Sequence, residues 1–110
     1  MQTRRELHRT PELLFDEKKT SAKIAQVLTA LNVNFTSGWA KNTKRAELAA
    51  KGFVSGEGGT GIVAQIGSGK EPCVLLRADI DGLPIHENIE SPWKSTEKGK
   101  MHACGHDNHV

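Results

Sequence analysis

Apolar residues fall at the spacing of one helix face between residues 17 and 31. They recur at i, i+3, i+4 and i+7, and they are Ile24, Val27, Leu28 and Leu31. A stripe of this kind packs against a core while the polar positions between its members face water. The pattern therefore predicts an amphipathic helix over about 17–31.

Two other segments have the composition of helices. Residues 1–10 are rich in strong helix formers and stop before Pro11, which disfavours helical backbone at the residue preceding it. Residues 43–51 can form a short helix, with Asn42 as its N-cap and Gly52 just past its C-terminus. We expect the stretch between the first two helices to be an irregular connection.

Runs of β-branched and other apolar residues predict three strands, over about 33–37, 61–67 and 72–80. The third run is almost wholly apolar, as in a strand buried on both faces of an α/β sheet. The turn-forming residues 68–71 would connect it to the second strand. We therefore expect an α/β fold in which helices pack on a mixed sheet and the second and third strands are adjacent.

Composition and charge exclude several classes of partner. The net charge of +2 is small, and aromatic residues do not alternate with the basic ones, so we expect no nucleic-acid partner. No run approaches the roughly 20 apolar residues of a membrane-spanning helix, and no apolar run follows the charged N-terminus as in a signal peptide. A cytoplasmic protein without a membrane partner is the default expectation.

Two carboxylates end the predicted third strand. Asp79 and Asp81 are two residues apart, so strand alternation places both on one face. Ligands of open α/β sheets bind at the carboxyl ends of strands, which makes this pair a candidate site. The equal alternative is an ordinary strand end whose acids cap the following turn.

The last ten residues, MHACGHDNHV, concentrate metal-ligating side chains. Cys104 and His106 can bind one ion together if their backbone is extended or in a loop, and Asp107 can orient a ligand or bind the ion itself. The alternative is a histidine-rich tail with weak metal affinity. The other cysteine, Cys73, lies in an apolar run and is expected to be a buried thiol.

Four stretches taken together resemble one known family. They are RRELHRTPELLFDEKKTS, GTGIVAQIG, RADIDGLPIHE and GKMHACGHDNH, and they cover nearly the whole chain in the family's order. The sequence resembles the amidohydrolase branch of the dinuclear metallopeptidases. That branch includes indoleacetic acid–amino acid (auxin-conjugate) hydrolases, hippurate hydrolases and N-acyl-amino acid amidohydrolases, and the last two stretches are specific to it.

The resemblance implies a metal-dependent hydrolase that cleaves the amide between an acyl group and an amino acid. Cys104 and His106 match metal ligands, and Asp81 matches the catalytic aspartate near the metals. Asp79 stands beside it, where related branches place a metal-binding histidine. Two divalent ions per full-length active site would polarise the carbonyl and activate a water, with manganese expected ahead of zinc, cobalt or nickel. The implied partner is a small N-acyl amino acid, and the full-length parent is expected to be a homodimer.

The sequence departs from the family in two places. Residues 40–57 exceed the family's usual link and are expected to be a surface insertion, since the cost of a longer loop grows slowly with length. The family's general-base glutamate, its other metal-binding histidines and its lid or dimerisation domain lie beyond the position matched by Val110. We therefore expect the N-terminal part of a metallopeptidase-type catalytic domain, inactive alone. A non-catalytic binding or regulatory remnant, or a truncated gene product, is the alternative.

Overall fold

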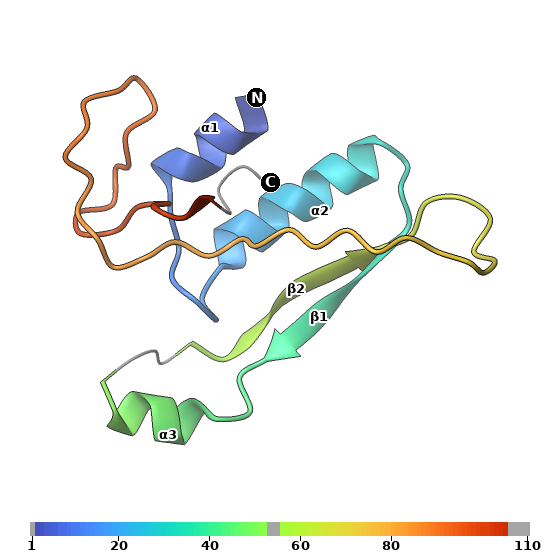
Figure 1. The fold of residues 1–110 in the computed structure, drawn as a ribbon, viewed down its shortest axis with the longest axis horizontal. Helices are drawn as coiled ribbons and strands as arrows, with labels where there is room; N and C mark the ends of the chain where they lie inside the picture. The colour runs from blue at the N-terminus through green and yellow to red at the C-terminus, as the bar shows by residue number, and fades with distance from the viewer. Residues whose placement is uncertain (1, 53–55, 106–110) are drawn as a thin grey trace.

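The computed structural model describes residues 2–52 and 56–105. In that part of the chain the elements are α1 (Gln2–Arg9), α2 (Lys18–Ala30), β1 (Phe35–Lys41), α3 (Arg45–Ala50) and β2 (Gly58–Ala64). Figure 1 shows α1 beside one end of α2, the β1–β2 hairpin beneath α2, and α3 at the far end of the hairpin. The expected α/β class is confirmed. None of the described helices is long and apolar enough to cross a membrane.

Helix α2 begins close to its predicted position and is capped by a residue outside it. The backbone amides of Lys19 and Thr20 donate to the Glu12 carboxylate at 3.0 and 2.8 Å. The Thr20 hydroxyl donates to the same carboxylate at 3.0 Å, and Thr20 is buried. A carboxylate at this position satisfies amides that have no partner within the helix and interacts favourably with the helix dipole.

Helix α2 ends in a Schellman motif, which delays the first strand. The Asn32 amide donates to the Thr29 carbonyl at 3.0 Å, and the Val33 amide donates to the Leu28 carbonyl at 2.9 Å. Asn32 takes the left-handed conformation, with φ 54°, that this motif requires. Val33 therefore belongs to the turn that ends the helix, and β1 begins at Phe35 rather than at Val33 as the sequence suggested.

Strands β1 and β2 form a two-stranded antiparallel sheet. Phe35 lies opposite Ala64 and Lys41 lies opposite Gly58, with irregularities on either side of Trp39. Helix α2 packs against β2 (Figure 1). Helix α1 was expected to pack on the sheet. Its hydrogen bonds to other segments instead join it to the loop that follows residue 84, through His8 and Arg9, and an ion pair between Glu6 and Lys23 at 2.8 Å joins it to α2.

The connection between the two strands carries α3 and is closed at its base. The Asn42 side chain donates to the Gly56 carbonyl at 2.9 Å, and its backbone amide donates to the Glu57 carbonyl at 2.9 Å. Gly52 follows α3 with φ 72°, as predicted, whereas Lys44 and not Asn42 is the residue at the N-cap. Whether residues 40–57 are an insertion relative to the family stays a prediction.

The expected third strand does not form. Residues 72–80 belong to no strand among the described residues, and they cross α2 as a separate extended segment (Figure 1). Cys73, expected to be buried, is exposed. The expected adjacency of 61–67 and 72–80 is wrong, and so is the turn at 68–71. No backbone hydrogen bond joins residues 72–80 to β2 or to any other described segment, and a strand needs such a neighbour, so the described sheet consists of β1 and β2 and is antiparallel rather than mixed.

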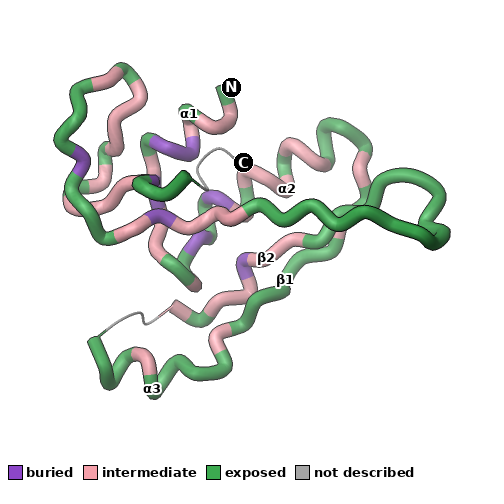
Figure 2. Tube along the Cα trace, viewed as in Figure 1, coloured by how far each residue is buried: buried purple, intermediate pink, exposed green. Residues whose placement is uncertain are grey.

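The apolar core is small. In residues 2–52 and 56–105, Leu7 is the buried hydrophobic side chain, and six polar or charged residues are buried too: His8, Glu17, Thr20, Thr60, Glu87 and His102. A cavity of about 480 Å³ lies between α2, β2 and residues 76–80. Ile24 and Leu28 of the predicted apolar stripe line this cavity, and Leu31 at the end of the stripe is exposed. Figure 2 shows buried stretches near α1 and α2, and an exposed chain along the loop that follows β2.

The irregular connection after α1 holds the sheet in place. The buried Glu17 carboxylate accepts hydrogen bonds from the Phe15 amide at 2.8 Å and from the Thr60 hydroxyl at 2.6 Å. The Phe15 carbonyl in turn accepts from the Gly58 amide at 2.9 Å. A Cβ at Gly56 would lie 2.3 Å from the same carbonyl, so a side chain there would displace the connection.

Replacing Glu12 by alanine should lower the free energy of unfolding by about 1–2 kcal/mol, because the amides of Lys19 and Thr20 lose their acceptor. Asp16→Ala is the matched control, since Asp16 is exposed and pairs with Lys18 at 3.5 Å, and it should have little effect. Urea unfolding followed by circular dichroism measures both. Equal losses in the two variants would contradict the capping role of Glu12.

Candidate functional site

The segment with the candidate acids and the segment with the candidate thiol lie side by side. Leu83 and Met101 form an isolated antiparallel bridge, in which each amide donates to the other residue's carbonyl, at 2.8 and 3.1 Å. Asp81 lies two residues before this bridge and Cys104 lies three residues after it. The bridge therefore brings the two sequence motifs to one region of the molecule.

Gly82 fixes the acidic segment to the N-terminal connection. Its amide donates to the Glu12 carbonyl at 2.6 Å, and it forms a parallel bridge with Leu13. A Cβ at Gly82 would lie 2.8 Å from the Cβ of Pro11, which is fully buried. Because neither neighbour can move freely, only glycine fits between the acids and this loop.

Two buried histidines, His8 and His102, link the segment that carries Cys104 to α1. The rings of His8 and His102 lie 6.1 Å apart, and both residues are buried. His8 Nε2 lies 3.1 Å from Glu87 Oε1, and the Ser95 amide donates to Glu87 Oε2 at 2.7 Å. The Thr96 amide donates to the carbonyl of Arg9, the last residue of α1, at 2.8 Å. Helix α1 is thus a support for the loop that precedes the candidate thiol.

The environment of Glu87 favours its ionised form. Burial raises the pKa of this carboxyl, but the Ser95 amide, the hydrogen bond and charge of His8, and the charge of Lys94 together outweigh burial. The pKa of Glu87 therefore lies below its ordinary value of 4.5. A charged carboxylate is held inside the protein by three separate partners.

The two candidate acids differ in their surroundings. Asp79 is a quarter exposed, pairs with Arg77 at 3.0 Å and lines the cavity next to α2. Asp81 is half-buried, and along the chain it lies between Asp79 and the Leu83–Met101 bridge. Strand alternation cannot place them on one face as expected, because no strand forms there among the described residues.

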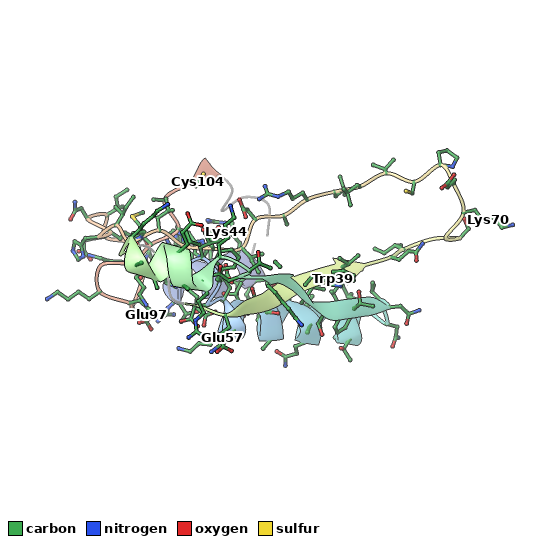
Figure 3. All side chains as sticks on the ribbon, turned by 90° about the horizontal axis from the view of Figure 1, so that it is seen from below. Trp39, Lys44, Glu57, Lys70, Glu97 and Cys104 are labelled. Atoms are coloured by element: carbon green, nitrogen blue, oxygen red, sulfur yellow. The ribbon has the colours of Figure 1, made fainter. Side chains whose placement is uncertain are left out.

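Cys104 is an exposed thiol at an edge of the molecule (Figure 3). It forms no disulfide with Cys73, which is also free. The other candidate ligands, His106 and Asp107, lie outside the described residues. Within residues 2–52 and 56–105, no group of three or more His, Cys, Asp or Glu side chains could hold a metal ion. The segments are brought together, but the described part does not complete a ligand set.

Sequence reasoning did not predict the residues that support this region. Glu12, Glu17 and Glu87 act through hydrogen bonds to distant parts of the chain, and no local pattern marks such contacts. His102 carried a signal, because it stands inside the histidine-rich motif, but its burial against α1 could not be inferred from spacing.

Comparison with known proteins gives the region its context. Residues 75–110 match the sequence model of the peptidase family M20/M25/M40. IAA-amino acid hydrolase ILR1-like 2 of Arabidopsis thaliana is 40% identical over 107 residues, which are 97% of this chain and 20% of that protein. Residues 75–110 therefore carry M20-family sequence. The resemblance inferred from the four sequence stretches is confirmed.

Two further relatives agree with this assignment. N-acetyldiaminopimelate deacetylase of Halalkalibacterium halodurans is 40% identical over 97% of this chain and 24% of that protein. The crystal structure of a Bacillus subtilis dinuclear metal binding peptidase of the M20 family matches with a TM-score of 0.73 and 36% identity, covering 96% of this chain and 25% of that one. The chain spans about a fifth to a quarter of the length of these three relatives.

The buried Glu87 predicts a specific dependence of stability on pH. Because its pKa is lower in the folded than in the unfolded chain, Glu87 stabilises the fold above about pH 4.5, and this contribution is lost as the pH falls through the folded-state pKa. The difference in unfolding free energy between the wild type and Glu87→Gln should therefore hold at neutral pH and shrink as the pH falls below about 4.5.

Glu6 provides the control for this experiment. Its pKa is also lowered, by hydrogen bonds from Lys23 and Gln2 and by the charge of Lys23, but it lies at the surface. Added salt at about 1 M should remove the effect of Glu6→Gln and leave that of Glu87→Gln, because salt screens exposed pairs far more than buried ones. A pH-independent Glu87→Gln difference would contradict the prediction.

Proposed function

We propose that the whole protein is a metal-dependent amidohydrolase that cleaves the amide bond of N-acyl amino acids, of the auxin-conjugate or hippurate type. Relatives with 40% identity over nearly this whole chain are named as an IAA-amino acid hydrolase and as an N-acetyldiaminopimelate deacetylase. Both names describe removal of an acyl group from an amino-acid nitrogen. A homodimer and a cytoplasmic location of the whole protein belong to the same proposal and rest on the sequence resemblance alone.

The single observation that carries the proposal is the Leu83–Met101 bridge. It aligns the Asp81 segment with the Cys104 segment through two backbone hydrogen bonds, and Gly82 ties both to the N-terminal connection. Backbone bonds of this kind fix the direction in which the neighbouring side chains leave the chain. An acid and a thiol from distant motifs are therefore kept on adjacent segments.

The donor chemistry of these residues fits a divalent ion. Cys104 is exposed and makes no disulfide, so its thiolate is available as a ligand together with His106. Asp81 is the proposed catalytic aspartate beside the metals, and Asp107 is a further or indirect ligand. The bound ions, two per site with manganese first and zinc, cobalt or nickel as alternatives, would polarise the scissile carbonyl and acidify a water molecule.

Asp79 has a different proposed role because of its neighbour. Its carboxylate pairs with the Arg77 guanidinium at 3.0 Å, and Arg77 is largely exposed. Water screens the exposed Arg77 end of this pair, whereas the Asp79 side chain is only a quarter exposed, so the carboxylate is held in place beside the proposed site. We assign Asp79 to orienting the acidic segment or to a weak additional ligand.

The whole protein, expressed from the complete coding sequence with manganese, should hydrolyse indoleacetyl-alanine, hippurate or N-acetyldiaminopimelate. Cys104→Ser should lower kcat/KM by at least about a hundredfold, since loss of a metal ligand weakens the ion that activates the water. Cys73→Ser is the matched control, because Cys73 is the other exposed thiol, and it should leave kcat/KM unchanged. Equal activity in both variants would remove Cys104 from the metal site.

The 110 residues alone should neither hydrolyse these substrates nor bind metal tightly. Cys104 and His106 supply two ligands, whereas bound zinc ions in proteins normally have at least about three from the protein. Titration with Co²⁺ should give weak thiolate absorption that disappears in Cys104→Ser and persists in Cys73→Ser. Turnover by the wild-type chain that disappears in Cys104→Ser would show that half of the site is sufficient.

A further inference from the structure

One face of helix α1 holds the long loop that leads to the candidate thiol. Arg5, His8 and Arg9 follow one another at i, i+3 and i+4, so they lie on the same side of the helix. The Arg5 guanidinium lies 4.1 Å from the centre of the Trp93 ring. The Arg9 carbonyl accepts hydrogen bonds from the amide and from the hydroxyl of Thr96, each at 2.8 Å. The loop is thus attached to the helix at several points.

His8 is the buried member of this face. Its Nε2 lies 3.1 Å from Glu87 Oε1, and the two side chains are only 9% and 6% exposed. Its ring centre lies 6.1 Å from that of His102, with the two ring planes tilted by 37°. One side chain of α1 therefore contacts the loop at Glu87 and also the residue that follows the Leu83–Met101 bridge.

A polar pair at this place serves direction more than stability. Removing a carboxylate and an imidazole from water is costly, and apolar side chains of similar size would hold a loop equally firmly. A hydrogen bond adds a preferred orientation, because an ionised carboxylate only accepts and the proton must lie on His8 Nε2. The bond to Glu87 therefore fixes the plane of the His8 ring, and with it the surface that meets His102.

The place of His102 in the chain gives this contact its importance. Met101 is held by two backbone hydrogen bonds to Leu83, and the next residue is held by α1. A chain attached at one residue can pivot, whereas attachment of two successive residues from different sides fixes the direction in which it continues. Cys104 follows only two residues later.

We propose that His8 and Glu87 are positioning residues of the metal site, which hold His102 and thereby the backbone that presents Cys104 to a divalent ion. This inference rests on the proposed function, because it concerns the same ions. It adds the first helix of the chain to a site whose candidate ligands all come from residues 79–107. Ligands must be held within about 0.5 Å of their productive positions, and loss of the groups that hold them typically weakens metal binding about 10- to 100-fold.

Co²⁺ binding by the whole protein tests the assignment, because absorption by the Co²⁺-bound thiolate reports on Cys104 without any turnover. His8→Leu removes the donor to Glu87 and should raise the Kd of Co²⁺ about tenfold and weaken this absorption. His8→Gln should stay within about threefold of the wild type, since its flat amide group carries an N–H donor at nearly the reach of the imidazole Nε2. Retention by glutamine would tie the effect to the hydrogen bond.

Leu7→Ala is the matched control, since Leu7 is the buried neighbour of His8 in the same helix. It should lower the melting temperature measured by circular dichroism but leave the Kd and the absorption of the folded protein unchanged. Glu87→Asp keeps the charge and shortens the side chain by one methylene. It should raise the Kd in the same direction as His8→Leu, and it replaces that variant if His8→Leu does not fold.

The outcomes separate this inference from the proposed function. If the absorption depends on Cys104 but neither His8→Leu nor Glu87→Asp changes it or the Kd, the positioning role is overturned and the metal site stands. An equal change in Leu7→Ala also overturns the role, because the effect would then follow from lost stability alone. If Cys104→Ser leaves the Co²⁺ spectrum of the whole protein unchanged, the proposed metal site and this inference are both overturned.

Discussion

The connection from Thr10 to Glu17 holds the described structure together. It has no helix or strand of its own, yet its carboxylates and carbonyls accept hydrogen bonds from three directions. The Glu12 side chain accepts hydrogen bonds from the first amides of α2, and the Glu12 carbonyl accepts one from the Gly82 amide. In β2, the Gly58 amide donates to the Phe15 carbonyl and the Thr60 hydroxyl donates to the Glu17 carboxylate. The helix, the sheet and the acidic segment are thus positioned by one short stretch of acceptors.

Reliance on hydrogen bonds follows from the small core. Each such bond contributes only about 1 kcal/mol net, but leaving a buried donor or acceptor without its partner costs more, so the network fixes geometry more than it adds stability. The α2 stripe faces a cavity of about 480 Å³, and the run at 72–78 faces outward. In both places the described residues leave apolar side chains uncovered.

The sequence predicted the elements whose signals are local. The periodicity of Ile24, Val27 and Leu28 located α2, and Gly52 marked the end of α3, because each pattern reflects the conformation of its own segment. The predicted start of β1 was wrong because an apolar residue at position 33 suits a strand and also suits the Schellman motif that ends α2. The strand at 72–80 was wrong because an apolar run forms a strand only when a neighbouring strand accepts it.

The candidate site was likewise predicted only in part. Residue type and spacing named Asp79, Asp81 and Cys104 as candidates, and the Leu83–Met101 bridge brings their segments to one region. The supporting roles of Glu12 and Glu87 could not be predicted, because their contacts with Gly82 and His8 join parts of the chain that lie far apart in the sequence. Their identity depends on three-dimensional contacts that a single sequence does not encode as a pattern.

Helix α3 has a practical consequence for work on this protein. The loop that carries it leaves and rejoins the hairpin at Asn42 and Glu57, where two hydrogen bonds close its base. The helix lies at the far end of the hairpin from α1, and none of its residues is buried (Figure 1). A fluorophore, an affinity peptide or a small inserted domain attached there would report on the molecule at a place separate in the sequence from the candidate segments around Asp81 and Cys104. The loop that carries α3 is therefore a suitable attachment point for labels.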